Sequence, residues 1–317
     1  MKILVTGSTG LIGKEVVKQL QAKNMEIVEY SNSQGQDILD LKQLKKAAKG
    51  CHGIIHLAAI IDENASKNKI WKTNVEGTKN VLDAATQEKV GRLVFLSSVG
   101  VYGNQTGTKT EETPSNPTSA YEKSKVEGEK LVQEYQELIS YTVIRSALVI
   151  GPNQYWKQIF KTVKKNTPLV GTGTNPWQTI YYKDLANAIV FLLFLDAAEN
   201  ETFLVAGEEK PSLKELVSIM RGQAGLSAKV PTVSVWMGKL MGFFLGILWK
   251  LQGKPNIFAG NNIDRLLRER AYDLTKMHAY GWKAKYSFQE ALKETLFELE
   301  QEGKNGKKKA LDKENAY

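Results

Sequence analysis

The stretch that decides the fold is residues 2–13, KILVTGSTGLIG. Its first five residues form an apolar run typical of a buried strand, and the apolar spacing of residues 11–23 predicts a helix immediately afterwards. In this setting Gly7 allows a tight turn, Gly10 lets backbone N–H groups approach a pyrophosphate, and Gly13 lets the helix pack against the strand. We therefore interpret the turn as a dinucleotide-binding loop. The residues assigned to it are Gly7, Thr9, Gly10, Leu11, Ile12 and Gly13.

Outward from this stretch, short apolar runs alternate with helical spacing as far as residue 150. The expected strands are 2–6, 27–30, 53–57, 92–96 and 141–144, and the expected helices are 11–23, 41–48, 71–87 and 119–138. Short apolar strands separated by helices indicate parallel strands that are buried on both faces. The sequence therefore predicts an α/β fold with a doubly wound parallel sheet, the Rossmann arrangement.

The alternation stops after residue 150. A loop-rich stretch follows, then a strand at 179–182 and an apolar helix at 184–195 that are expected to rejoin the sheet, and then a mostly helical region. We expect a dinucleotide-binding domain, a smaller and mostly helical C-terminal substrate lobe, and a basic flexible tail. Their expected ranges are 1–150 with about 179–206, 151–178 with 207–301, and 302–317.

Composition excludes several classes of protein. Of the 317 residues, 42% are hydrophobic and 24% charged, which argues against wholesale disorder and against a fibrous protein. The single cysteine, Cys51, excludes an internal disulfide, and with only three histidines we expect no metal site. The net charge is +9, and five lysines lie in residues 304–317. We therefore interpret much of the excess positive charge as a solvated chain end and expect no nucleic-acid partner. Because Met1 leads directly into a strand pattern, we expect no signal peptide and a cytoplasmic protein.

A tyrosine and a lysine stand four residues apart in the sequence YEKSK, residues 121–125. On a helix this spacing places Tyr121 and Lys125 on one face, where an ammonium group stabilises a phenolate whose ordinary pKa is ~10. Tyr121 can then exchange a proton with a substrate hydroxyl or carbonyl. Ser98 follows the strand at 92–96, at the carboxyl end where parallel strands deliver functional groups, and can hydrogen-bond the reacting oxygen. Alone, the YxxxK pattern is also compatible with a solvated helix face.

Taken together, the motifs carry a family resemblance. They are TGSTGLIG (6–13), HLAA (56–59), NVEGTKNVLDAA (74–85), SSVGVYG (97–103), YEKSK (121–125), IRSALVIGP (144–152), WQTIYYKDLANAI (177–189) and AYDLTKMHAYGWKAKYSFQEAL (271–292). In this order they resemble the extended short-chain dehydrogenase/reductase family, which contains NAD-dependent epimerases and dehydratases. The resemblance covers nearly the whole chain before the tail, and it implies a homodimer formed through the helices at 71–87 and 119–138.

The resemblance also implies roles for individual residues. Ser98, Tyr121 and Lys125 match the catalytic triad of the family, and Lys125 would also bond the nicotinamide ribose. Asn74 matches an asparagine that is either conformational or in contact with the cofactor. The other residues matched to the cofactor pocket are Asp37, Ile38, Leu57, Ala58, Ala59, Ser97, Ser146 and Leu148. The residues expected to contact substrate are Ile60, Ser98, Val99 and Tyr121.

Two departures from the family pattern bear on cofactor and substrate. Ser31 stands where NAD-preferring relatives carry an acid that binds the ribose 2′-hydroxyl, so we favour NADP over NAD, although Lys14 is the nearest basic residue in the sequence and no arginine is close. Leu148 stands where UDP-galactose 4-epimerases carry an asparagine, which favours a reductase. Val99 and Gly100 stand where dehydratases carry an Asp-Glu pair.

An apolar stretch lies at residues 233–251, VSVWMGKLMGFFLGILWKL. Its unbroken core, residues 240–249, is too short to span a bilayer. The preferred interpretation is a segment that walls an apolar substrate pocket, ahead of an oligomer contact and of a helix resting on a membrane surface.

The sequence therefore predicts an NAD(P)-dependent oxidoreductase. It would transfer a hydride between nicotinamide and a secondary alcohol or ketone of a small, rather apolar substrate, with Tyr121 as acid and base. One alternative is a nucleotide-sugar 4-epimerase with tightly bound NAD. Another is a non-catalytic dinucleotide-binding sensor or scaffold, which the intact Ser98, Tyr121 and Lys125 argue against.

Overall fold

The computed structural model describes residues 1–62, 64–240, 242 and 260–314, and the chain divides into two units. Unit 1 comprises Met1–Val149, Ile180–Glu208 and Tyr272–Lys285, and unit 2 comprises Ile150–Thr179, Glu209–Ala271 and Tyr286–Tyr317. The segment Tyr272–Lys285 had been expected in the substrate lobe. It belongs to unit 1 because Met277 is buried in that unit's core and Lys276 Nζ contacts Glu201 Oε2 at 2.7 Å.

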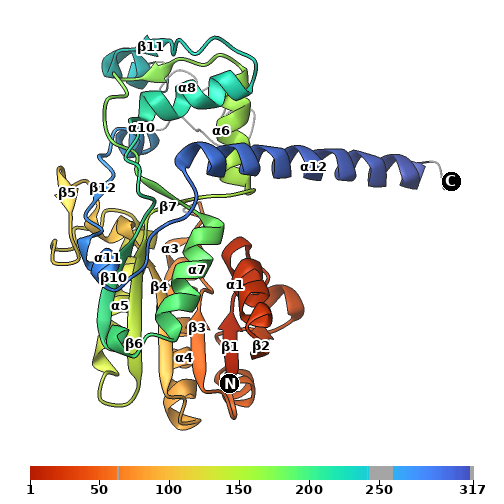
Figure 1. Cartoon of the computed structure of the whole chain (residues 1–317), viewed down its shortest axis with the longest axis vertical. Coiled ribbons are helices and arrows are strands. Elements are labelled where there is room, and N and C mark those ends of the chain that lie inside the picture. Colours follow the sequence, from red (N-terminus) through yellow and green to blue (C-terminus); the bar gives the residue numbers. More distant parts are fainter. Residues whose placement is uncertain (63, 241, 243–259, 315–317) are drawn as a thin grey trace. The chain divides into compact units, whose positions relative to one another are not determined.

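Unit 1 is built on a six-stranded parallel sheet in the order β10-β6-β4-β3-β1-β2 (Figure 1). Its strands are β1 (Lys2–Thr6), β2 (Glu26–Tyr30), β3 (Gly53–His56), β4 (Arg92–Ser98), β6 (Ser140–Ser146) and β10 (Glu201–Val205). The expected doubly wound Rossmann fold is confirmed, with one correction to its strands. The strand at Thr179–Tyr181 (β9) lies outside this sheet, and β10 supplies the sixth strand.

Both faces of the sheet are buried, because successive side chains of a strand point to opposite sides. Ile3 and Val5 of β1 join one apolar cluster, whereas Leu4 between them joins the other. The first cluster includes residues from α1 (Leu11–Ala22) and α7 (Tyr182–Leu193). The second includes residues from α2 (Leu41–Ala48), α4 (Gly77–Gln87) and α5 (Ala120–Glu134).

The helix expected over residues 71–87 is divided. It consists of α3 (Lys67–Trp71), a π-helical turn at Lys72–Glu76, and α4. The remaining short elements of unit 1 are η1 (Asn32–Gln34), η3 (Val99–Tyr102), η4 (Asp196–Ala198), β5 (Thr108–Lys109) and α11 (Thr275–Ala279). The strands β7 (Leu148–Ile150), β9 and β12 (Ala271–Tyr272) lie where the chain passes from one unit to the other.

Unit 2 is mostly helical, as the sequence predicts. Its elements are α6 (Gln154–Lys164), β8 (Leu169–Val170), α8 (Leu213–Gln223), β11 (Thr232–Val233), α10 (Gly260–Leu266) and α12 (Phe288–Glu314). Trp156, Leu216 and Leu292 are buried within it. Helix α12 continues to Glu314 and therefore covers most of the segment expected as a tail, whose five lysines are compatible with a helix.

Two expectations concern membranes and metals. Within the described ranges, no helix combines the length and the apolar character needed to cross a bilayer. In the same part of the chain, no group of three or more His, Cys, Asp or Glu residues is placed to hold a metal ion. The apolar run at 240–249 lies almost entirely outside the described residues.

Candidate active site

The loop between β1 and α1 has the geometry of a phosphate cradle. Gly7 adopts φ +73°, a conformation that favours glycine, and a Cβ at this position would lie 2.9 Å from the Ala58 nitrogen. A Cβ on Gly13 would lie only 2.2 Å from the Gly7 carbonyl oxygen, so the first turn of α1 can pack against the loop only with glycine there. Gly10 is the N-cap of α1, which leaves Leu11 and Ile12 in the first turn.

A buried hydroxyl supports the assignment of this loop to a dinucleotide. Ser8 Oγ is buried and has no hydrogen-bond partner among the described residues. Unpaired buried polar groups are rare in folded proteins, and this one lies beside the N-terminus of α1, where anions bind. The residues present therefore fit a pyrophosphate.

Three hydroxyl groups meet at the carboxyl end of β2. Thr9 Oγ1 lies 2.5 Å from Ser31 Oγ and 2.8 Å from Ser33 Oγ, and the two serine oxygens are 3.1 Å apart. The sequence singled out Thr9 and Ser31 here but not Ser33. The position that carries an acid in NAD-preferring relatives is therefore filled by a neutral cluster that can both donate and accept hydrogen bonds.

Asp37 and Ile38, expected beside the adenine, are partly committed to the protein. The Asp37 carbonyl accepts a 2.7 Å hydrogen bond from the Tyr30 hydroxyl, and its Oδ1 accepts one from the Leu39 nitrogen. Ile38 is buried in the second cluster, and a Cβ on Gly77 would lie 2.6 Å from its Cδ1. The Ile38 side chain therefore packs in the core.

The first turn of α5, which carries Tyr121, is fixed by a capping box. Ser119 Oγ accepts a hydrogen bond from the Glu122 nitrogen. Glu122 Oε2 accepts hydrogen bonds from the nitrogen atoms of Thr118 and Ser119 at 2.8 and 3.0 Å. Such a box satisfies backbone donors that a helix otherwise leaves unpaired. Tyr121 is therefore held on a helix end whose backbone has little freedom.

Lys125 lies one turn further along α5 and is buried against β4. Its Nζ donates a 2.8 Å hydrogen bond to the Leu96 carbonyl oxygen and lies 4.9 Å from the centre of the Phe95 ring. The close approach depends on Gly128, since a Cβ there would lie 2.7 Å from Phe95 Cζ. Burial lowers the pKa of Lys125 to about 8, against a smaller opposing effect of Glu129.

Ser98 ends β4 and caps the short helix η3. Its Oγ accepts a 3.0 Å hydrogen bond from the Gly100 nitrogen. A Cβ on Gly100 would meet Glu122 Cγ at 3.0 Å and Ser98 Oγ at 3.3 Å, so a larger side chain at position 100 would crowd both. Val99, the other expected substrate contact in this turn, is half-buried and packs against the first cluster.

A buried histidine links the carboxyl ends of β1 and β3 to α4. His56 Nδ1 lies 2.7 Å from Thr6 Oγ1, and Nε2 lies 3.0 Å from Thr78 Oγ1. Burial, together with the nearby charge of Lys125, lowers the pKa of His56 to about 3, so the ring is neutral at pH 7. Because the Thr78 hydroxyl donates its proton to the Asn74 carbonyl at 2.6 Å, it must accept from Nε2–H, and Nδ1 therefore accepts from Thr6.

Asn74 continues this chain of hydrogen bonds to α5. Its Oδ1 accepts from the Ile60 nitrogen at 2.8 Å, and its Nδ2 donates to the Ile60 carbonyl at 3.0 Å and to Ser124 Oγ at 2.9 Å. Ser124 Oγ in turn donates to the Tyr121 carbonyl at 2.7 Å. Asn74 is only 2% exposed. Of its two expected roles, this favours the conformational one over contact with the cofactor.

Ser97, also expected to contact the cofactor, has its hydroxyl committed to the protein. Its hydroxyl is buried and donates to Glu129 Oε1. Neighbouring residues of a strand point to opposite faces, so Ser97 and Ser98 cannot both present their hydroxyls to the same side of β4.

The other expected cofactor residues lie at the carboxyl ends of β3 and β6. Leu57, Ala58 and Ala59 directly follow β3 and are half-buried. Ser146 ends β6 directly opposite Ser98, and Leu148 opens β7.

The sequence did not single out several residues that organise this region. Ser33, Thr6, His56, Thr78, Ser124, Glu129 and Arg145 are the residues concerned. For Glu129 a signal was available, because it lies four positions after Lys125 on the same predicted helix.

Comparison with known proteins agrees with this geometry. A profile of the NAD dependent epimerase/dehydratase family matches residues 3–206. The chain is 26% identical over 313 residues to an N-acetyl-alpha-D-glucosaminyl-diphospho-ditrans,octacis-undecaprenol 4-epimerase of Escherichia coli O157:H7, covering 93% of this chain and 94% of that protein. It is 28% identical to a UDP-glucose 4-epimerase of Vibrio cholerae, covering 92% of this chain and 94% of that protein.

A solved structure shows the same fold. The UDP-glucuronic acid 4-epimerase from Bacillus cereus in complex with NAD superimposes with a TM-score of 0.75 at 22% identity, covering 95% of this chain and 99% of that one. With the profile match spanning well over half of the chain, the protein belongs to the NAD dependent epimerase/dehydratase family and is an enzyme of the extended short-chain dehydrogenase/reductase class.

Proposed function

We propose that the protein is an NAD-dependent 4-epimerase of a hexose that is linked through C1 to a diphosphate. The observation that carries the proposal is the buried Lys125, fixed to the end of β4 and one turn from Tyr121 on a capped helix. The support beyond this chain is that two relatives matched over more than nine-tenths of its length are named as sugar 4-epimerases. This replaces the oxidoreductase of a small apolar substrate as the preferred function.

The chain's own residues supply the acid and base. Tyr121 removes the proton from the C4 hydroxyl and later returns it, and the Lys125 ammonium stabilises the phenolate in between. Ser98 hydrogen-bonds the same oxygen. The nicotinamide supplies reversible hydride acceptance, so no net oxidation occurs. The loop of Gly7, Gly10 and Gly13 would hold the dinucleotide through its pyrophosphate.

The geometry disfavours a dehydratase. Elimination requires an additional acid near the sugar, but Val99 and Gly100 stand where dehydratases of this family carry an Asp-Glu pair, and a Cβ at position 100 would already crowd Glu122 Cγ at 3.0 Å. Glu122, the nearest carboxylate to this position, is 1% exposed and committed to capping α5. Ser98 and Tyr121 therefore lack the partner that elimination requires.

For the cofactor we propose NAD, in place of the expected preference for NADP. The hydroxyl cluster of Thr9, Ser31 and Ser33 can bond ribose hydroxyls, but it brings no positive charge for a 2′-phosphate. Epimerisation also needs a dinucleotide that is retained between turnovers, and the solved Bacillus cereus relative contains NAD.

The substrate class is chosen on the relatives, whose names describe a sugar linked to a diphosphate. The carrier attached to this diphosphate is a nucleoside in one relative and a polyprenol in another.

The decisive experiment is a conversion assay with two carriers. The protein is incubated with NAD and either UDP-N-acetylglucosamine and UDP-glucose, or a polyprenyl diphospho-N-acetylglucosamine in detergent, and the 4-epimer is quantified by NMR. Tyr121→Phe should lower the rate by ~10²–10⁴-fold while binding of NAD survives. Net consumption of NADH with a ketone, and no 4-epimer from either carrier, would establish the reductase instead.

The homodimer remains a proposal as well. The helices expected to form it correspond to α3–α4 and α5, and Trp71 at the end of α3 is 43% exposed. Sedimentation of the wild type and of Trp71→Glu tests this, with a monomeric wild type as the contrary result.

A further inference from the structure

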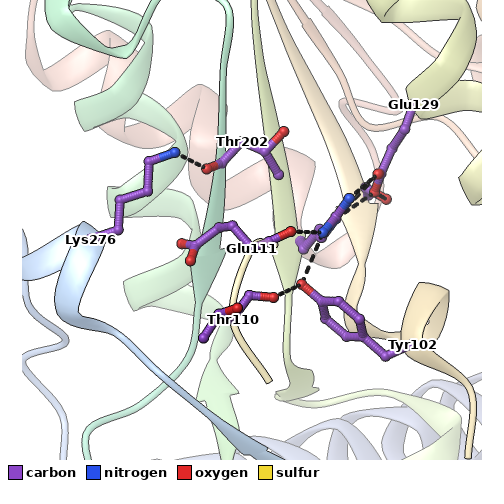
Figure 2. A network of polar contacts seen from close by, with 8 residues as sticks. Tyr102, Thr110, Glu111, Glu129, Thr202 and Lys276 are labelled. Atoms are coloured by element: carbon purple, nitrogen blue, oxygen red, sulfur yellow. Dashed lines mark hydrogen bonds and ion pairs between the residues drawn. The ribbon is translucent and has the colours of Figure 1, made fainter. Parts of the chain in front are cut away.

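A buried ionic network lies directly behind the proposed acid–base pair. Arg145 of β6 forms a bidentate pair with Glu129 of α5, with Nη2–Oε2 and Nε–Oε1 distances of 2.8 and 3.1 Å. Arg145 Nη1 also donates to the Tyr102 hydroxyl at 3.0 Å and to the Glu111 carbonyl at 2.7 Å (Figure 2). Glu129 and Arg145 are 5% and 8% exposed.

Such a pair is a poor means of gaining stability. Removing two charges from water costs several kcal/mol per ion, and replacing a buried pair with apolar residues is often neutral or favourable. Burial opposes the charge on Arg145, yet its hydrogen bonds to Glu129 raise its pKa above the usual value, so the guanidinium is always charged. The pair therefore has a role other than stability, and the residues around it indicate which.

Those surroundings are the two catalytic elements. Glu129 follows Lys125 by one turn of α5, a spacing that places their side chains about 5–6 Å apart at Cβ. The same carboxylate accepts a hydrogen bond from the hydroxyl of Ser97, the residue immediately before Ser98 on β4. One side chain thus contacts the strand that presents Ser98 and adds a negative charge beside the lysine that supports Tyr121.

We propose that Glu129 is a positioning residue for the acid–base pair: its carboxylate, oriented by Arg145, keeps Lys125 positively charged and fixes the end of β4 at Ser98. The inference rests on the proposed role of Tyr121 and Lys125.

The charges around Lys125 give the direction of the effect. On α5, Lys125 has Tyr121 and Glu129 as neighbours. The nearby group from β3 is His56, which is neutral, and Arg145 of β6 lies behind Glu129. Tyr102 of η3 stays un-ionised, because burial raises its pKa to about 12. Glu129 is the only anion in this set, so removing its charge must favour the neutral amine of Lys125.

The test is a direct titration of Lys125 that needs no substrate. Protein with ¹³C-labelled lysine is titrated by NMR, and the Lys125 Cε signal is assigned by its loss in Lys125→Met. In Glu129→Gln, which keeps an acceptor for Ser97, the midpoint should fall by about one unit or more. In Arg145→Gln it should rise. In the double variant Glu129→Gln/Arg145→Gln it should lie below wild type but above the single Glu129→Gln variant.

The double variant separates charge from folding. Breaking a buried pair on one side is strongly destabilising, whereas the double variant leaves two neutral amides that can bond each other. If the network were only structural, the double variant would recover both stability in urea and the wild-type midpoint. The control is Glu127→Gln, a half-buried carboxylate on the same helix that pairs with Lys130 Nζ at 3.3 Å, which should leave the Lys125 midpoint unchanged.

Kinetics gives the second readout. The fall in epimerase rate at high pH, where Lys125 loses its proton, should move to lower pH in Glu129→Gln and in the double variant. An unmoved Lys125 midpoint in folded Glu129→Gln overturns the inference, even if Tyr121→Phe is inactive. Conversely, a shifted midpoint together with a fully active Tyr121→Phe would refute the proposed function and leave the electrostatic role of Glu129 standing.

Discussion

Replacing Lys125 with methionine should make the protein more stable and nearly inactive. Burial lowers the pKa of this lysine from 10.5 to about 8. At 1.36 kcal/mol per unit, keeping the ammonium charged costs the folded state about 3 kcal/mol at pH 7. Methionine occupies a similar volume without charge but loses the 2.8 Å hydrogen bond to the Leu96 carbonyl, worth about 1 kcal/mol. The expected net gain in the free energy of unfolding is about 2 kcal/mol.

The pH dependence identifies the cause. The folded-state pKa lies below the unfolded value, so both states are charged below about pH 8 and the cost is fully present there. As the pH rises from about 8 towards 10.5, the folded protein loses the proton first and the cost disappears. The stability advantage of Lys125→Met should therefore shrink over this range.

Urea unfolding at pH 7 and at several higher values measures the effect, and epimerase assays measure the rate, which should fall by at least ~10²-fold. Lys123→Met on the exposed side of the same helix is the matched control, with an expected change within about 0.5 kcal/mol. A Lys125→Met variant that is less stable than wild type at pH 7, or whose advantage does not depend on pH, would refute the reasoning from desolvation.

Three further changes test other parts of the site. Gly10→Val should fold, since a Cβ there meets only the Gly7 carbonyl oxygen at 3.3 Å, but it should lose dinucleotide binding in calorimetry. Gly13→Ala, whose Cβ would lie 2.2 Å from the same oxygen, should instead strongly lower the urea concentration at which the protein unfolds. Ser31→Asp should tighten NAD binding and exclude NADP in the same assay, because a carboxylate bonds the ribose hydroxyls and repels a 2′-phosphate, and equal affinities for both would contradict the placement of the ribose. Asn74→Ala should cost about 1–3 kcal/mol in urea unfolding and lower the epimerase rate more than NAD affinity, because it leaves the Ile60 backbone groups unpaired.

The fold could be predicted from the sequence because its sheet is buried on both faces. Short apolar runs separated by helical spacing leave few other arrangements, and the strand and helix ranges differ from expectation mostly by one to four residues at their ends. Strand β10, ETFLV, was not predicted because three apolar residues after Asn-Glu-Thr do not stand out from a loop. Such a segment becomes a strand because it pairs with β6 at the edge of the sheet, and this pairing is not visible in the sequence.

The π-helical turn at Lys72–Glu76 shows a different limit. The apolar spacing of residues 71–87 is compatible with one continuous helix, and nothing in a one-dimensional pattern indicates a widened turn. In the structure the turn contains Asn74, whose amide reaches both Ile60 and Ser124. Turns of this kind concentrate at functional sites, and this one places the asparagine at the meeting point of two other segments.

Site residues could be predicted where a motif carries its own chemistry. The glycine loop, Tyr121 and Lys125 were found because their spacing has a local physical meaning. His56 and Arg145 were missed because their partners lie 22 or more and 16 or more positions away, so their roles exist only after folding. The contact of the Ser97 hydroxyl with Glu129 was missed for the same reason, because the two residues are 32 positions apart.

The charges on these buried residues affect one another. Four of them could carry charge behind Tyr121: Lys125, Glu129, Arg145 and His56. The pair of Glu129 and Arg145 has no net charge, with Glu129 as the member that acts on Lys125, and His56 is neutral because burial and Lys125 both disfavour its protonation. A single positive charge therefore remains on the group nearest the proposed base. A second cation would make the ammonium of Lys125 harder to keep, and an unpaired anion would make a phenolate on Tyr121 harder to form. The neutral histidine and an ion pair without net charge thus allow one lysine to act on one tyrosine.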